Sequence, residues 1–307
     1  MAHNAYSQTL SRIKRNLEAG QEMGLLSVFT GAFGAKRTKL DQRFDFNRKW
    51  IQGSGGRFHI VKERSSGKTF GIKLIDPEKE KQFRSRFETK FSSEAQIALS
   101  FQHSNIVKTY EIGVSQQGND FILMELIQGV LLENAVAERQ ARVQKNGIQI
   151  IRQLAKALQY IHEQGYIHRD FCPRNILIDS EFTTVKLFDF GLTVPNAAEY
   201  RLPKNRTGTP IYMAPEIVRR RATSVSVDLF AFGITAYQIL TLEHPWGVEE
   251  NSSKSALLFD SRKPTEIREH LPRLPSQIAD AIMSCLEADP SKRCDSIKKF
   301  SLKMGVR

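Results

Sequence analysis

Cysteine is scarce in this sequence. The 307 residues contain only Cys172, Cys285 and Cys294, and no two of them form a Cys-x-x-Cys pair. An odd and widely spaced set excludes a disulfide framework and argues against a structural zinc site. A reducing compartment therefore fits the composition best, and we expect a cytoplasmic protein.

Long apolar runs are also missing. The N-terminus has no apolar core of the kind that a signal peptide carries. The most apolar stretch, Val225 to Leu242, is interrupted by Asp228 and Gln238. It therefore predicts a buried helix, and we expect no transmembrane segment.

Acidic residues are too few to balance the basic ones, and the formal net charge is +12. Such a charge suits nucleic acid, an anionic membrane or acidic protein substrates. Aromatic residues do not alternate with the basic clusters, however, and no nucleic-acid-binding motif is present. We interpret the charge as a solvated basic surface and expect no nucleic-acid partner.

Residues 1–45 form an extension that is expected to be helical in part. Between Ala5 and Met23, four apolar side chains recur at helical spacing, namely Tyr6, Leu10, Ile13 and Leu17. Glycines at 24, 31 and 34 then interrupt the pattern. The extension would dock on the following domain, touch a membrane surface or bind a partner, and docking is the simplest interpretation.

The rest of the chain changes character near residue 126. Before it, the pattern predicts strands at 44–52, 57–62, 69–75, 106–114 and 121–125, and one charged helix over 78–101. After residue 129, apolar stripes at helical spacing dominate, apart from a loop-rich stretch at 166–216. A strand-rich part followed by a helix-rich part predicts an α+β fold with two lobes.

The strongest chemical signal is the run from His168 to Asn175, which reads His-Arg-Asp-Phe-Cys-Pro-Arg-Asn. It resembles the catalytic loop of eukaryotic-type protein kinases, in which His-Arg-Asp is followed by four residues and Asn. The resemblance implies that Asp170 is the catalytic base that receives the proton of the substrate hydroxyl. It also implies that Asn175 ligates Mg²⁺ through its amide oxygen.

Further motifs follow in the family's order. Asp189-Phe190-Gly191 resembles the magnesium-binding Asp-Phe-Gly motif, so Asp189 would join the metal to phosphate. Ala-Pro-Glu at 214–216 resembles the end of the activation segment. The resemblance implies that Glu216 pairs with Arg293, and that Asp228 supports the catalytic loop from the apolar helix.

The strand-rich part would contribute the ATP contacts. Gly71-Ile72-Lys73 resembles the end of Val-Ala-Ile-Lys, so Lys73 would hold the α- and β-phosphates. Its partner is expected to be Glu94, with Glu88 as the competing choice. The linker residues Glu125 and Ile127 would bind adenine through backbone groups, with Met124 at the back of that pocket. The resemblance covers about residues 46–305, with an N-lobe at 46–125, a linker at 126–129 and a C-lobe at 130–305.

The glycine-rich loop departs from the family pattern. Gly53, Ser54, Gly55 and Gly56 would cover the ATP phosphates, because glycine lets the backbone approach closely. The family places a third glycine where Phe58 stands. The expected cover over the γ-phosphate is therefore less close.

Two positions bear on the acceptor residue. Cys172 stands where serine/threonine kinases usually have Lys, and Arg174 stands where tyrosine kinases have Arg, so Arg174 would supply the missing positive charge. The longer match, Gly208 to Glu216, resembles the serine/threonine version, with Thr209 bonded to Asp170. We therefore predict a serine/threonine kinase that uses ATP and Mg²⁺, with a tyrosine or dual-specificity kinase as an alternative.

Charge near the acceptor suggests a preference among protein substrates. Arg174, together with Arg201, Lys204 and Arg206, would repel basic substrate residues. We therefore expect neutral or acidic surroundings for the acceptor. Arg169 would either pair with a phosphate on Thr207 or Tyr200, or brace the loop without phosphorylation; both alternatives stay open.

Three other functions compete with this interpretation. A pseudokinase would share the fold without the chemistry, and the broken glycine pattern favours it, whereas the presence of Lys73, Asp170 and Asp189 opposes it. A small-molecule kinase of similar fold would lack the Ala-Pro-Glu segment. A P-loop hydrolase, suggested by Gly67-Lys68-Thr69, needs a glycine where Lys62 stands, so that match fails.

Overall fold

The computed structural model describes residues 37–53, 55–88, 90–202, 207–247, 258–259 and 261–305. The predicted helix at 5–23, Ser54, Lys204 and Arg206 lie outside these residues. The described chain divides into two compact units, one made of 37–77 and 109–124 and the other of 78–108 and the residues from 125 onward. In the described part, no helix is long and apolar enough to cross a membrane.

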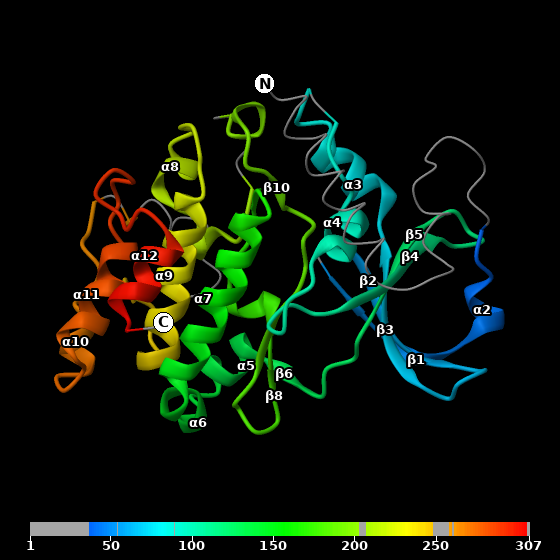
Figure 1. Ribbon diagram of the computed structural model, residues 1–307, viewed down its shortest axis with the longest axis horizontal. Helices are drawn as coiled ribbons and strands as arrows, with labels where there is room; N and C mark the ends of the chain where they lie inside the picture. The colour runs from blue at the N-terminus through cyan, green and yellow to red at the C-terminus, as the bar shows by residue number, and fades with distance from the viewer. Residues whose placement is uncertain are drawn as a thin grey trace. The chain divides into compact units, whose positions relative to one another are not determined.

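The first unit is an antiparallel sheet whose strands lie in the order β1-β2-β3-β5-β4 (Figure 1). Its elements are α2 (Leu40–Arg43), β1 (Phe44–Gln52), β2 (Gly56–Glu63), β3 (Thr69–Ile75), β4 (Thr109–Val114) and β5 (Asp120–Met124). The sequence patterns predicted these five strands to within three residues, because β-branched and aromatic residues alternate between turn residues.

One face of this sheet carries the unit's core. Leu40, Phe44, Val61, Ile72 and others form one buried cluster. Because successive side chains of a strand point to opposite faces, the neighbours of Ile72 on β3, Gly71 and Lys73, belong to the other face. The predicted ATP-binding lysine is thus opposite the core.

The glycines at the two ends of the loop between β1 and β2 are hydrogen-bonded to each other. The Gly53 amide donates to the Gly56 carbonyl at 2.8 Å, and the Asp76 amide donates to the Gly55 carbonyl at 3.0 Å. A Cβ on Gly56 would lie 2.1 Å from the Leu74 carbonyl oxygen. Glycine is therefore required at 56 for β2 to approach β3.

The second unit is mainly helical. Its helices are α3 (Pro77–Arg84), α4 (Glu94–Ser100), α5 (Leu132–Ala137), α6 (Ala141–Lys145), α7 (Gly147–Glu163), α8 (Pro215–Val218), α9 (Ser226–Thr241), α10 (Ile267–His270), α11 (Ser276–Cys285) and α12 (Ile297–Lys303). The first residue of α3, Pro77, still belongs to the first unit. Its short strands are β6 (Gly129–Leu131), β7 (Tyr166–Ile167), β8 (Ile176–Asp179), β9 (Val185–Leu187) and β10 (Val194–Pro195).

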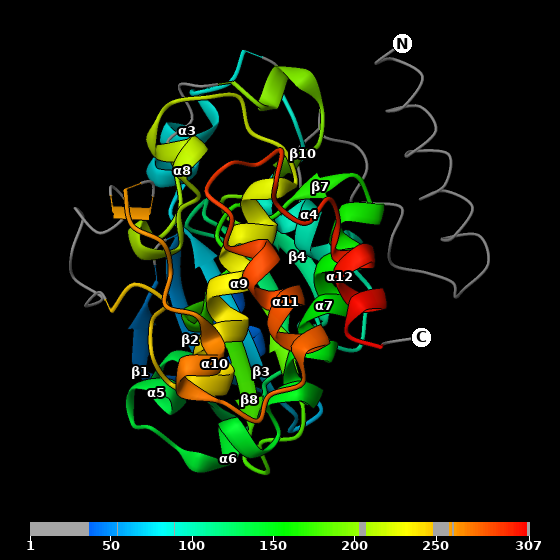
Figure 2. The ribbon, with the colours of Figure 1, turned by 90° about the vertical axis from the view of Figure 1, so that its left-hand side faces the viewer.

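Helix α9 is the centre of the second unit. It packs against α7 and α11, and α12 contacts both α7 and α11 (Figure 2). Every residue from Val227 to Thr241 is buried, as expected for a helix that is apolar all round. The predicted buried helix at 225–242 is confirmed in the structure.

The single helix predicted over 78–101 is wrong, because two helices, α3 and α4, occupy this range. Ser93 starts the second one: its hydroxyl accepts the Gln96 amide while the Gln96 side chain accepts the Ser93 amide. This capping box satisfies amides that a continuous helix would use otherwise. Between the helices, Phe83, Phe87 and Phe91 pack their rings together, with centroids 5.2–6.4 Å apart.

The ion pair between Glu216 and Arg293, both 2% exposed, anchors α8 to the segment before α12. Two guanidinium nitrogens donate to the two carboxylate oxygens at 2.7 and 3.0 Å. The same guanidinium donates to the Glu287 carbonyl at 2.8 Å and to the Ser226 carbonyl at 2.8 Å. Such a bidentate, fully bonded pair is costly to break from one side.

We predict that Arg293→Ala lowers the free energy of unfolding by about 3–5 kcal/mol, because the Glu216 carboxylate stays buried without its cation. Urea unfolding measures this loss. In the control, Arg139→Ala removes an exposed pair with Glu243 and is expected to change stability by less than about 1 kcal/mol. Equal losses in the two variants would contradict the role given to burial.

Candidate active site

Asp170, the predicted catalytic base, is held by hydrogen bonds to both of its carboxylate oxygens. Oδ1 accepts the Thr209 amide at 2.8 Å and the Thr209 hydroxyl at 2.6 Å. Oδ2 accepts Nδ2 of Asn175 at 3.0 Å and a guanidinium nitrogen of Arg174 at 3.1 Å. The carboxylate is 7% exposed and has one fixed orientation.

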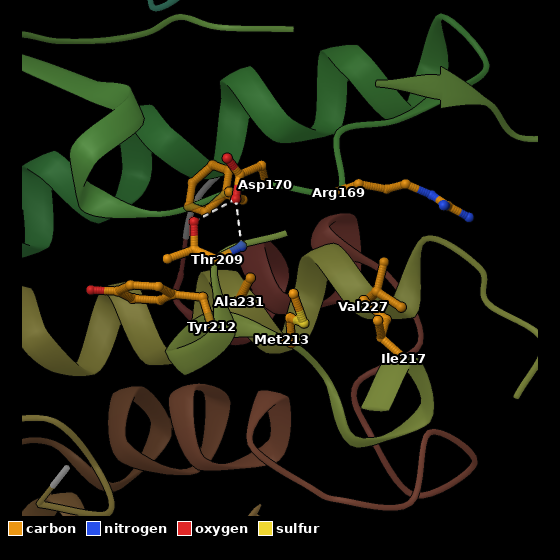
Figure 3. A pocket seen from close by; sticks show the side chains of 9 residues that line it. Arg169, Asp170, Thr209, Tyr212, Met213, Ile217, Val227 and Ala231 are labelled. Atoms are coloured by element: carbon orange, nitrogen blue, oxygen red, sulfur yellow. Dashed lines mark hydrogen bonds between the residues drawn. The ribbon is translucent and has the colours of Figure 1, made fainter. Parts of the chain in front are cut away.

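The carboxylate borders a small pocket (Figure 3). Thr209, Tyr212 and Met213 line it from the activation segment, and Val227 and Ala231 line it from α9. The Arg169 side chain runs away from Asp170 in this view. Besides Asp170, the lining is mostly apolar, and Thr209, Tyr212 and Arg169 are its other polar members.

The carboxylate of Asp228 holds the backbone of the predicted catalytic loop. Its oxygens accept the His168 and Arg169 amides, each at 2.8 Å, and lie 2.8 Å from Nε2 of His162. Burial alone would raise the pKa of Asp228, but the hydrogen bond and charge of His162 and the His168 amide lower it below its usual value. Asp228 is therefore an ionised acceptor inside the protein.

Backbone strain marks two places in the predicted motifs. Arg169 has φ 69° and Asp189 has φ 67°, both in the left-handed region that ordinary residues avoid. Strained backbone of this kind persists where surrounding contacts over-determine it, often at functional sites. At Arg169, the bonds to Asp228 provide that constraint.

The two predicted metal ligands have suitable donor chemistry. Asn175 uses Nδ2 on the Asp170 carbonyl and carboxylate, at 2.8 and 3.0 Å, so its Oδ1 faces elsewhere as a hard oxygen donor. Asp189 accepts the Gly191 amide at 3.3 Å. An amide oxygen and a carboxylate fit Mg²⁺, which takes few protein ligands and completes its shell with phosphate and water oxygens.

Glu94, the predicted partner of Lys73, begins α4 and is 8% exposed, whereas Glu88 is exposed and outside any helix. A Cβ on Gly191 would lie 3.2 Å from Oε2 of Glu94 and 3.3 Å from Oδ1 of Asp189. The Glu94 and Asp189 carboxylates therefore flank the same glycine. The pairing of Glu94 with Lys73, which lies in the other unit, stays a prediction.

Lys73, Glu125 and Ile127 are the remaining residues predicted to contact ATP, and these contacts stay predictions. Lys73 is in β3 opposite Phe58 and Ile122. Glu125 donates its amide to the Lys108 carbonyl at 2.9 Å and binds Lys186 through its carboxylate at 2.5 Å. Its backbone carbonyl is thus the group left for a base, and Ile127 follows two residues later, half-buried.

Cys172 lies beneath the loop and is fully buried, with Sγ 3.6 Å from the Thr209 hydroxyl. Burial raises the pKa of its thiol, and the Asp170 charge raises it further. The residue is therefore a protonated space-filler. Arg174 keeps its charge: burial lowers its pKa, but Asp170 more than offsets this and raises it.

Arg169 braces the activation segment from the loop. Its guanidinium donates to the Tyr200 carbonyl at 2.7 Å and to the Thr223 hydroxyl at 2.9 Å, and burial lowers its pKa to about 10. The Tyr200 ring packs on Phe87 and Phe91 at 5.6 and 5.2 Å. Tyr200 is only 4% exposed and Thr207 only 7%, so phosphorylation of either would first require the segment to open.

No motif in the sequence pointed to His162 or His244. His244 supports the activation segment through its ring: Nε2 donates to the Ile211 carbonyl at 3.1 Å, and Nδ1 accepts the Trp246 amide at 3.3 Å. Only the neutral ring makes both bonds. Burial lowers the pKa of His244 to about 4, despite the Ile211 carbonyl.

Comparison with known proteins identifies the family of this chain. The sequence profile of the protein kinase domain matches residues 44–301, and the chain therefore belongs to the protein kinase family.

The chain is 29% identical over 260 residues to an Aurora kinase of Saccharomyces cerevisiae, covering 84% of this chain and 67% of that one. It is 28% identical to an Aurora kinase of Yarrowia lipolytica, covering 87% and 69%. It is also 29% identical to the hormonally up-regulated neu tumor-associated kinase of Homo sapiens, covering 80% of this chain and 34% of that relative. The match thus spans about two thirds of the Aurora relatives and one third of the human one.

We predict that His244 makes stability fall in acid. Its folded pKa of about 4 lies below the ordinary 6.5, so the unfolded chain binds more protons between these values. The neutral His244 ring stabilises the folded protein fully above about pH 6.5. As the pH falls toward 4, the free energy of unfolding is expected to decrease by on the order of 3 kcal/mol.

Urea unfolding between pH 7 and 4 tests this prediction against His244→Gln, whose amide keeps a donor and an acceptor but does not titrate. The variant is expected to lose less stability in acid than the wild type. His270→Gln, at an exposed position, serves as the control. Identical pH profiles for the wild type and His244→Gln would overturn the assignment.

Proposed function

We propose that this protein is a serine/threonine protein kinase that transfers the γ-phosphoryl group of ATP to protein substrates. The observation that carries the proposal is the double hydrogen bond from Thr209 to Asp170. It joins the activation segment to the predicted base and leaves a small pocket beside the carboxylate. This bond is expected to shape a shallow groove that suits the short side chain of serine or threonine.

Each predicted residue has a part in the transfer. The acceptor oxygen attacks the γ-phosphorus, the bond to the β,γ-bridging oxygen breaks, and ADP leaves, while Asp170 receives the hydroxyl proton. Lys73 and the glycine-rich loop hold the phosphates. Bound Mg²⁺ would supply charge neutralisation for ATP, and Asn175 and Asp189 would hold it. Arg174 adds a positive charge near the transferred group.

The location proposed for this activity is the cytoplasm. The support is chemical: Cys172, Cys285 and Cys294 are all free and buried, as expected for a protein of a reducing compartment.

We predict that Asp170→Asn lowers kcat about 100- to 10,000-fold, because the amide cannot accept the proton. Transfer of labelled phosphate from ATP to a generic protein substrate measures the loss, and phosphoamino-acid analysis identifies the acceptor. ATP affinity is expected to stay within a few-fold. Asp280→Asn, at an exposed position on α11, is the matched control.

The same assay separates the competing functions. A wild-type chain that binds ATP and transfers no phosphate would be a pseudokinase, and phosphotyrosine as the main product would indicate a tyrosine kinase. Either result would overturn the proposed function.

We also propose that substrates are neutral or acidic around the acceptor. Arg174 lies beside Asp170 with its side chain 39% exposed. Its charge would repel a cationic substrate residue and attract an anionic one. Arg201 would add to this field, because its guanidinium is bonded to the uncharged Asn196 side chain, at 2.6 Å, and keeps its charge.

We predict that the wild type prefers peptides with Glu over Arg next to the acceptor, and that Arg174→Glu shifts the ratio of their kcat/KM values at least ten-fold toward Arg. Paired peptides that differ in that one residue measure the ratio, which cancels any general loss of activity. Arg152→Glu, exposed on α7, controls for net charge. A wild-type preference for Arg would refute this prediction.

A further inference from the structure

The face of the sheet that carries Lys73 is incomplete at one point. Gly71, Lys73 and Met124 lie on this face, since Gly71 pairs with Met124 and successive residues alternate between faces. Phe58 and Ile60 of β2 lie there too, opposite Lys73 and Gly71. Among these positions, only Gly71 contributes no side chain.

The ring of Phe58 fills the place that Gly71 leaves open. A Cβ added to Gly71 would lie 2.7 Å from Cε2 and 2.8 Å from Cζ of Phe58. These distances are shorter than any contact that two carbon atoms tolerate. The ring therefore leans diagonally from its own strand position toward Gly71, a reach that aromatic side chains have across neighbouring strands.

Met124 approaches the same point from the other side. Its Cγ would lie 3.2 Å from the added Cβ. Phe58 and Met124 are both half-buried, so neither is enclosed by the sheet itself. Together they cover Gly71 with apolar surface.

The two residues that depart from the family pattern here are thus in contact with each other. Phe58 stands where a third glycine is usual, and Gly71 stands where Val-Ala-Ile-Lys has alanine. A methyl group at 71 would force the ring of Phe58 out of its present position. The larger residue at one position is therefore matched by the smaller residue at the other.

We propose that Phe58 is a base-binding residue, whose ring over Gly71 forms, with Met124, the apolar surface against which the adenine of ATP packs. This inference rests on the proposed function for the identity of the nucleotide.

Position on the strand favours the base over the phosphates as the group that meets Phe58. Lys73 is the expected phosphate ligand, and Gly71 lies two residues away on the same face, which is about 7 Å along the strand. A nucleotide separates its base from its phosphates by the ribose over a similar length. A phenyl ring has no donor for phosphate oxygens, but it stacks well on a planar base.

The test compares the binding of Mg·ATP and Mg·tripolyphosphate to the full chain by calorimetry. Phe58→Ala is expected to weaken ATP binding about ten-fold, because stacking on an aromatic ring is lost, and to change tripolyphosphate binding less than two-fold. Phe58→Leu fills the space without a ring, and its ATP affinity is expected to lie between those of the wild type and Phe58→Ala. It serves as the second variant should alanine compromise folding.

Variants at both Phe58 and Gly71 provide a second, more specific test. Gly71→Ala alone is expected to weaken ATP binding, because the methyl group displaces the ring. The double variant Phe58→Gly/Gly71→Ala restores the usual family pattern and is expected to recover most of the affinity. Tyr110→Ala removes another aromatic ring, 47% exposed on β4, and should leave the affinity unchanged.

The outcomes separate this inference from the proposed function. Unchanged or tighter ATP binding by Phe58→Ala would overturn the inference and leave the kinase function standing; tighter binding would mean that the ring obstructs the base. Equal losses for ATP and tripolyphosphate would also overturn it, since the effect would not be on the base. A wild type that binds no ATP would instead contradict the proposed function.

Discussion

The buried carboxylate of Asp228 is the constraint on which the site of the second unit depends. An ionised carboxylate inside a protein is very unfavourable unless its oxygens are fully bonded. Here the bonds come from His162 and from two consecutive amides, those of His168 and Arg169. Those amides cannot turn away without leaving the charge unsatisfied. The loop is therefore fixed at the residue before Asp170, including the unfavourable φ of Arg169.

From that fixed point, the site extends through short contacts to segments that are distant in sequence. Asp170 receives bonds from Asn175 within its own loop and from Thr209 of the activation segment. The activation segment is itself held by Arg169 at the Tyr200 carbonyl and by His244 at the Ile211 carbonyl. Because each of these bonds uses a buried polar group, loss of one leaves a partner unsatisfied. The geometry at Asp170 thus depends on several interactions outside the loop.

Much of the architecture could be predicted from the sequence, and the exceptions have physical causes. The strands of the first unit and helix α9 follow from local periodicity, which is recorded in consecutive residues. The single helix predicted over 78–101 is wrong, although Phe83, Phe87 and Phe91 recur at helical spacing. The capping box at Ser93 begins a second helix there, and the Tyr200 ring, more than a hundred residues away, completes the aromatic cluster. The Ser-x-x-Gln signal for the second helix start lies in the sequence itself, whereas the contact of Tyr200 comes only from tertiary packing.

The sequence alone determined the family, the order of the motifs and the chemical identity of the predicted catalytic and metal-binding residues, since those signals lie within short runs such as 168–175 and 189–191. Only the tertiary structure decided how they are supported. It revealed that His162 bonds to Asp228, that His244 is held neutral, and that Phe58 fills the space over Gly71. Contacts of this kind join residues that chain reversals and packing bring together, and a pattern within one segment does not record which distant side chain fills a gap.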